Sequence, residues 1–185
     1  MIIPNFISVD ASLNCLVITS NIIKNKTIRV QKYLKTDNFS KDFYLILKKN
    51  KINLDLANLL LVNLGPGSYA GIRNILSCLK VLSIIKKIKL VGFTNNIMWK
   101  IVCKDKHKDC FMIINVNKKF FNLSTNKELK IQQLNKILSK KKVVSNYQYS
   151  GIFKKNLISF TYNIKDMKIL VNKKLFIEKN INPKY

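Results

Sequence analysis

The sequence has 185 residues, enough for one domain or for two small lobes that share a core. Its composition, 48% hydrophobic and 10% aromatic, excludes an intrinsically disordered chain. With 34 basic residues against 9 acidic ones it has a formal net charge of +25, an excess that attracts polyanions such as RNA.

The first half of the chain alternates strands and helices. Two β-branched runs separated by a short polar turn predict a hairpin, and an alternating segment predicts a third strand. Next comes a helix capped by Asn38 or Ser40, followed by a buried strand and a second helix. A short strand and a third helix, which starts after Thr94, complete this half. The expected ranges are 6–10, 13–20 and 27–34 for the first strands, 39–51 for the first helix, 56–65 for the buried strand, 69–87 for the second helix and 89–93 for the last strand.

The second half is plainer and gives shorter elements. Residues 111–116 and 120–125 predict a hairpin, and a basic amphipathic helix runs from Leu129 to about Lys141. Two short strands follow, in VVSN and LISFTYN. We place the lobe boundary near residues 104–109, which gives lobes of residues 1–104 and 105–185. The whole pattern predicts an α/β protein with mixed sheets flanked by helices.

Three of the five glycines lie within GPGSYAG, residues 65–71. A P-loop requires GxxxxGK[ST], but Gly71 is followed by Ile72 and Arg73. The Rossmann fingerprint is GxGxxG with an acid about twenty positions later, whereas this loop is GxGxxxG and residues 85–95 contain no acid. With both nucleotide motifs excluded, the segment is a buried strand, a Gly-Pro-Gly turn and a helix. The N-terminus of such a helix can hold an anion.

The helix expected over residues 69–87 is apolar around more than half of its circumference. Its large apolar positions are Ile72, Ile75, Leu76, Leu79, Leu82 and Ile85. A helix that covers a sheet needs one apolar face, so the second face predicts a partner molecule. The small residues Ala70, Ser77 and Cys78 would let a partner helix approach closely. The alternative is a helix that is simply central in the fold.

LVNLGPGSYAGIRNILSCLKVL closely resembles the GPGSFTGxRxGxxxAxGL signature of the TsaB (YeaZ) family of tRNA threonylcarbamoyladenosine biosynthesis proteins. FISVDASLNCLVIT is similar to the family's opening IDTSxxxxSVAL, with Asp10 and Ser12 at its first two characteristic positions. LVGFTNNIMW and the closing PKY are similar to the family's GVSSLEALA and PxYLR segments. The resemblance is specific over residues 6–100, about half of the chain.

The resemblance implies an actin-like ATPase (ASKHA, ribonuclease H-like) fold of two lobes, the second one reduced. It also implies a non-catalytic dimerisation subunit, paired with the catalytic paralogue TsaD or with a second copy of itself. TsaD moves threonylcarbamoyl onto the adenosine beside certain tRNA anticodons, a TsaE-like ATPase binds the pair, and tRNA is reached indirectly through the complex. The chain would have no cofactor of its own, and ATP or ADP would lie at the interface with TsaD.

The resemblance places the partner interface on the first two helices and a loop contact at the glycines. The expected interface residues are Phe39, Phe43, Tyr69, Ile72, Arg73, Ile75, Leu76 and Leu79. By its place on the first turn of the second helix, Arg73 would pair with a carboxylate of the partner; the alternative is a solvated surface charge. The expected contacts to an anion or nucleotide are Asp10, Ser12, Gly65, Gly67, Ser68 and Gly71.

Two departures from the family pattern and one comparison with the catalytic paralogue bear on catalysis. Ala70 replaces the threonine of GSFTG, and NVNKKFF at residues 115–121 lacks the acid and arginine of the family's DARxxEVY. The catalytic paralogue holds its metal with an HxxxH pair, and this chain has His107 alone. We therefore expect a subunit that is not itself an enzyme. A weak actin-like ATPase using Asp10 stays a further alternative.

A small basic RNA-binding module is the alternative from a different class. Against it, only Arg29 and Arg73 are arginines, although RNA-binding surfaces usually use the planar fork of arginine. The abundance of lysine, asparagine and isoleucine together is typical of an AT-rich genome instead.

Targeting and metal signals are weak. The chain has no apolar run of about 18 uncharged residues and no secretory signal at MIIPNFISVD, so we expect no membrane span and a cytoplasmic protein with reduced cysteines. Cys103, His107 and Cys110 lie close together in sequence, but a structural zinc site needs four ligands in recognisable pairs, so we predict no metal site.

Overall fold

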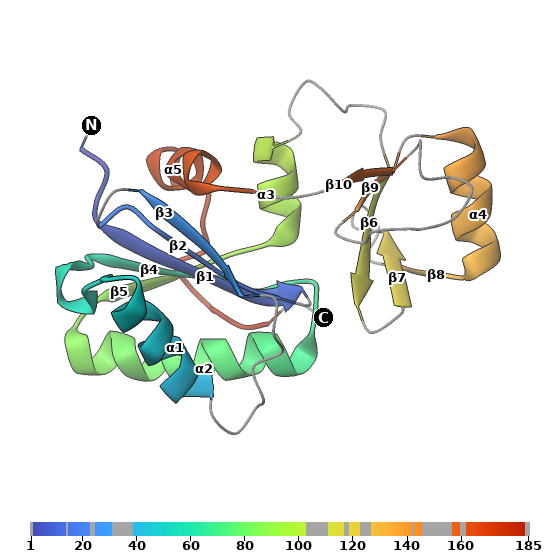
Figure 1. Cartoon of the computed structure of the whole chain (residues 1–185). Helices are drawn as coiled ribbons and strands as arrows, with labels where there is room; N and C mark the ends of the chain where they lie inside the picture. The colour runs from blue at the N-terminus through green and yellow to red at the C-terminus, as the bar shows by residue number, and fades with distance from the viewer. Residues whose placement is uncertain are drawn as a thin grey trace.

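The computed structural model describes residues 2–13, 15–22, 25–30, 39–102, 111–116, 119–122, 127–141, 143–145, 157–159 and 162–183. Two five-stranded sheets form the framework, and helices lie beside each of them (Figure 1). Among the described residues, no helix is long and apolar enough to cross a membrane.

The first sheet has the strand order β3-β2-β1-β4-β5. Its strands are β1 (Phe6–Leu13), β2 (Cys15–Ser20), β3 (Lys26–Val30), β4 (Leu59–Asn63) and β5 (Lys89–Phe93). β1, β2 and β3 form an antiparallel meander, and β4 and β5 run parallel to β1 on its other side. The predicted hairpin, the buried strand and the strand over 89–93 are confirmed.

Helices cover both faces of the first sheet. On one face lie α1 (Phe39–Lys49) and α2 (Tyr69–Lys86). The short 3-10 helix η2 (Leu54–Leu56) lies between α1 and β4 in the sequence. On the other face lies α3 (Asn95–Val102), and Figure 1 shows the two helical layers above and below the strands. Because both faces are covered, every residue of β4 is buried, as its continuous apolar run predicts.

The second sheet repeats this arrangement with shorter strands, in the order β10-β9-β6-β7-β8. Its elements are β6 (Phe111–Val116), β7 (Lys119–Asn122), β8 (Lys127–Leu129), α4 (Ile131–Lys140), β9 (Val143–Ser145) and β10 (Leu157–Ser159). Again three antiparallel strands are followed by two strands parallel to the first of them. β8 was not expected, and the predicted helix begins two residues later than its sequence pattern indicates.

The repeat is unequal at one place. Residues 64–88 join β4 to β5 and contain α2, whereas only residues 146–156 join β9 to β10. That second connection is shorter than α2 itself, so it cannot hold a helix of the same length. The second lobe is therefore reduced at the position where the first lobe carries its longest helix.

The chain returns to the first sheet at its end. α5 (Ile164–Asn172) packs beside α3, and its apolar residues join the core formed by β1, β4 and β5. The buried side chains that the returning segment adds to this core are Tyr162, Met167, Leu170 and Val171. The expected division at residues 1–104 and 105–185 is therefore wrong for residues 162–183, which belong with the first lobe.

The residues after α5 close one edge of the first sheet. Ile177 and Gly92 of β5 exchange two backbone hydrogen bonds, of 2.8 Å from the Gly92 amide and 2.7 Å from the Ile177 amide. Glu178 and Lys89 form an exposed ion pair of 2.9 Å, and this partner lowers the pKa of the Glu178 carboxyl. Pairing of this kind covers an edge strand that would otherwise present free backbone groups.

Candidate functional site

The glycine loop packs directly on the end of β1. The amide of Ser68 donates to the carbonyl oxygen of Ser12 at 2.6 Å. A Cβ atom at Gly67 would lie 2.2 Å from that oxygen, and one at Gly71 would lie 2.2 Å from the carbonyl oxygen of Ala11. Gly67 and Gly71 are therefore required for the close contact of two backbone segments.

Two buried asparagines hold the loop from the other side. The Asn63 side chain accepts from the amide of Gly65 at 2.9 Å and donates to Asn95 Oδ1 at 2.8 Å. Asn95 Nδ2 in turn donates to Ser12 Oγ at 3.1 Å and to the carbonyl oxygen of Pro66 at 2.7 Å. Gly65 has φ of 97°, a conformation that favours glycine. β1, β4, the loop and α3 thus meet in one buried polar network.

Asp10 lies beside this network and is 2% exposed. Its Oδ1 accepts from the amide of Ser12 at 2.7 Å, and its Oδ2 accepts a short hydrogen bond from the hydroxyl of Tyr162. Tyr162 also stacks edge-on against Phe93, with ring centroids 6.2 Å apart. Both oxygens of this carboxylate are therefore bonded within the chain.

The structure brings the six predicted loop residues together, but it uses them to join elements of the protein. The amides of Gly65 and Ser68 donate to Asn63 and Ser12 of the same chain. Ser68 is the N-cap of α2, and its Oγ accepts from the amide of Gly71 at 3.3 Å. Since Asp10 and Ser12 also have internal partners, these residues do not fit a nucleotide site built on the loop itself.

The predicted interface is wrong for most of its apolar members. Five of them are buried against the sheet of the same molecule, namely Phe43, Ile72, Ile75, Leu76 and Leu79. They form the core-facing side of α1 and α2 and cannot contact a partner without unfolding. Tyr69 and Arg73 are exposed, with Arg73 Nη1 donating to the Tyr69 hydroxyl at 3.4 Å, while the side chain of Phe39 lies outside the described residues.

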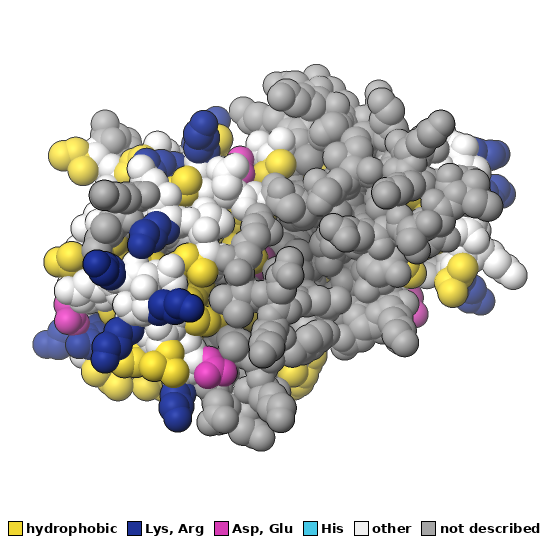
Figure 2. All heavy atoms as spheres, in the orientation of Figure 1, with side chains coloured by type: hydrophobic (Ala, Val, Ile, Leu, Met, Phe, Trp, Pro, Cys, Tyr) yellow, Lys and Arg dark blue, Asp and Glu magenta, His cyan; other side chains and the backbone are white. Residues whose placement is uncertain are grey.

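Another side of α2 carries exposed apolar residues toward its C-terminal end. Ile84, Ile85 and Val81 are 78%, 67% and 55% exposed. Figure 2 shows hydrophobic and basic side chains side by side over the lower left of the molecule, where this end of α2 lies in Figure 1. On neighbouring α1, Tyr44 and Leu45 are exposed as well. The second apolar side expected for this helix is present, and Ile85 was among its expected residues, whereas Val81 and Ile84 were not.

The exposed side of α2 has a regular spacing. Five residues lie alternately four and three positions apart along its length, and we call them the α2 seam. They are Ala70, Asn74, Ser77, Val81 and Ile84. Asn74 is half-buried and the other four are exposed. The four-and-three spacing is the one that lets two helices pack along their length.

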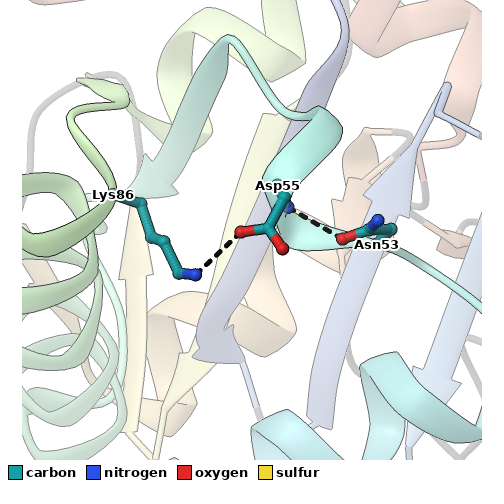
Figure 3. Close-up of polar contacts among 3 residues, drawn as sticks. All are labelled: Asn53, Asp55 and Lys86. Atoms are coloured by element: carbon teal, nitrogen blue, oxygen red, sulfur yellow. Dashed lines mark hydrogen bonds and ion pairs between the residues drawn. The ribbon is translucent and has the colours of Figure 1, made fainter.

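A separate contact fixes the C-terminal end of α2. Lys86 reaches η2 and pairs with Asp55 at 2.7 Å, and Asn53 accepts from the amide of Asp55 at 2.9 Å (Figure 3). Both partners of the ion pair are substantially exposed, so the pair adds little to stability. The ion pair with Asp55 does, however, hold the Lys86 side chain, which is not one of the α2 seam residues.

Cysteine and metal chemistry adds no site among the described residues. Burial raises the pKa of the Cys78 thiol, and a hydrogen bond with Ser40 of α1 opposes this in part. No group of three or more histidine, cysteine, aspartate or glutamate side chains gathers in the part of the chain that the structure describes. Cys103, His107 and Cys110 lie outside those residues.

Two sheets of the same strand order, with helices beside them, define an α/β protein of the actin-like ATPase fold. The sequence matches no protein-family model and has no significant match among curated proteins. The structure is similar to YeaZ from Pseudomonas aeruginosa and to an uncharacterised protein from the same organism with similarity to peptidase YeaZ. Each match has a TM-score of 0.58 and 8% identity, and covers 98% of this chain and 99% of the other. The chain therefore has the overall fold of YeaZ.

Proposed function

We propose that this chain is the non-catalytic dimerisation subunit of a cytoplasmic tRNA N6-threonylcarbamoyladenosine threonylcarbamoyltransferase complex, in which it pairs with a TsaD-like paralogue. Two likenesses support a TsaB-type role: the fold agrees with YeaZ over the whole chain, and GPGSYAGIR resembles the TsaB signature. The observation that carries the proposal is the exposed apolar side of α2.

The exposed side of α2 is large enough to support association. Full burial of a valine or isoleucine side chain contributes about 1.5–3 kcal/mol. Given their exposed fractions, Val81, Ile84 and Ile85 together can contribute about 3–6 kcal/mol, which is about 10²- to 10⁴-fold in the dissociation constant. Contacts from Tyr44 and Leu45 of α1 would add to this, and ordering costs would subtract from it.

The loop supports a structural rather than a chemical role. Asp10 accepts hydrogen bonds from Tyr162 and Ser12, and the loop amides donate within the chain. In the proposed complex the chemistry belongs to the paralogue. ATP or ADP would be held at the interface between the two proteins, a TsaE-like ATPase would bind the pair, and tRNA would be contacted through the complex.

Co-expression with the TsaD-like paralogue of the same genome tests the proposal. We expect the two chains to elute together from a size-exclusion column, and Ile84→Asp to abolish co-elution together with threonylcarbamoyl transfer to tRNA. Ile169→Asp is a matched control, because Ile169 is also exposed but lies on α5, across the sheet from α2.

Three results would count against the proposal. Wild-type chains that do not co-elute would refute the pairing, and co-elution unchanged by Ile84→Asp would refute the α2 surface. Tight binding of tRNA by the isolated chain, with a steep dependence on salt, would favour the RNA-binding alternative.

A further inference from the structure

The α2 seam has unlike sides. One flank carries Arg73 and Lys80, seven positions apart on α2, and the basic C-cap residue Lys87 follows just beyond the end of the helix. All three are exposed. The other flank carries Gly71, Cys78 and Ile85, none of them charged. When two helices pack along seams of this spacing, the flanking residues face each other across the contact and set partner choice and orientation.

The basic flank has no acidic neighbour on its own helix. The sequence of α2, YAGIRNILSCLKVLSIIK, contains no aspartate or glutamate. Nearby Asp55 is paired with Lys86 instead (Figure 3). Within the part of the chain that the structure describes, none of the three flank residues forms an ion pair. Among the residues that the structure describes, this positive row beside the apolar strip therefore has no ion-pair partner.

Pairing of two copies through this seam would not compensate the row. In an antiparallel pair, flanks of the same kind meet, so Lys80 would face its own copy and Arg73 would lie near the C-terminal end of the other helix, which Lys87 follows. Like charges placed opposite each other destabilise an interface. In a parallel pair, the basic row would face the uncharged flank and would find no acid there either.

We propose, building on the function proposed above, that this basic flank selects a helix of the paralogue whose facing flank is acidic, and so favours the mixed pair over self-association. The apolar end of the seam would supply most of the binding free energy, and the flank would supply orientation and discrimination. Asn74 lies among the seam residues, where a polar side chain fixes the register of two packed helices at a cost in stability.

Charge reversal of the flank tests this selection. The variant Arg73→Glu/Lys80→Glu/Lys87→Glu is compared with Lys165→Glu/Lys173→Glu/Lys174→Glu, whose three exposed lysines lie on and after α5. Both variants change the net charge by the same amount. Binding to the purified paralogue is measured by calorimetry between about 0.05 and 0.5 M salt, a range over which surface charges become screened.

We expect the flank variant to bind the paralogue at least about tenfold more weakly at low salt, and the α5 variant to bind as wild type does within about twofold. Salt should weaken binding of the wild type and strengthen that of the flank variant, a reversal that mere loss of packing would not produce. Lys80→Glu alone should show the same reversal to a smaller degree. Sedimentation of the wild type by itself should show a monomer.

Each contrary outcome has its own meaning. If the wild type binds the paralogue and the flank variant binds equally well, the selection is refuted while the proposed function stands. If the α5 variant loses as much affinity, net charge and not the flank is responsible, and the selection is refuted again. A wild-type dimer that Ile84→Asp dissociates would refute the preference for a mixed pair. No binding of the wild type would refute both proposals together.

Discussion

The hydrogen bond between Tyr162 and Asp10 joins the segment that returns to the first sheet to its first strand, and Tyr162→Phe removes it. The substitution keeps the aromatic ring, so the edge-on contact with Phe93 and the packing in the core are retained. What is lost is one donor to a carboxylate that is 2% exposed. In the Tyr162→Phe variant, Asp10 would still accept the hydrogen bond from the amide of Ser12.

The expected loss follows from the charge and the burial of the acceptor. A hydrogen bond to a charged group contributes about 1.5–3 kcal/mol. For a protein of this size, 1 kcal/mol corresponds to a shift of about 2–4 °C in Tm. Tyr162→Phe should therefore lower the free energy of unfolding by about 1.5–3 kcal/mol and the Tm by about 3–12 °C.

Urea unfolding followed by circular dichroism measures this loss. Tyr69→Phe is the matched control, since Tyr69 is an exposed tyrosine on α2 and its variant should stay within about 0.5 kcal/mol of wild type. The double-mutant cycle with Asp10→Ala should give a coupling energy of about 1 kcal/mol or more. A Tyr162→Phe variant as stable as Tyr69→Phe, or a coupling energy near zero, would show that this contact does not hold the chain end in place.

Three further predictions concern the loop and the closed sheet edge. Gly67→Ala should cost about 1–3 kcal/mol or more in urea unfolding, because the added Cβ meets a backbone oxygen; a stable variant would contradict this close approach. Asn95→Ala removes three side-chain hydrogen bonds and should cost about 2–4 kcal/mol, whereas Asn96→Ala should be near neutral; equal effects would contradict the network. Ile177→Pro removes the amide that pairs with β5 and should speed hydrogen exchange in that strand, whereas Glu178→Ala should leave it unchanged.

The strand and helix order of the first lobe could be predicted because its signals are local. Apolar β-branched runs, a Gly-Pro-Gly turn and a long helical period each lie within one segment of the sequence. The buried strand over 59–63 is the clearest case, since a continuous apolar run indicates a strand covered on both faces. Its ends differed by a few residues because the preceding Leu54–Leu56 forms a 3-10 turn.

The choice of the exposed side of α2 failed for a physical reason. Periodicity showed that apolar residues occupy more than half of the helix, but it cannot tell which stripe the sheet will cover. The sheet covers the stripe of Ile72, Ile75 and Leu79, which gives the densest set of large side chains. Ile84 and Val81 are then left on the solvent side.

The asparagines and the tyrosine of the polar network were missed because their partners are far away in sequence. Asn63 and Asn95 are 32 residues apart, and Tyr162 and Asp10 are 152 residues apart. No local pattern reports such contacts. α5 had a usable signal, because Asn163 and Asp166 form a capping box just ahead of an apolar helical pattern.

β1 and α5 lie far apart in the sequence but share one core, and this constrains the order of events during synthesis. Proteins usually fold from the N-terminus as they emerge from the ribosome. Here β1 is translated well before the α5 residues that shield one face of it. The first sheet must therefore wait for α5 before this apolar face is sealed, and a chain that stopped short of α5 would be damaged in its first sheet.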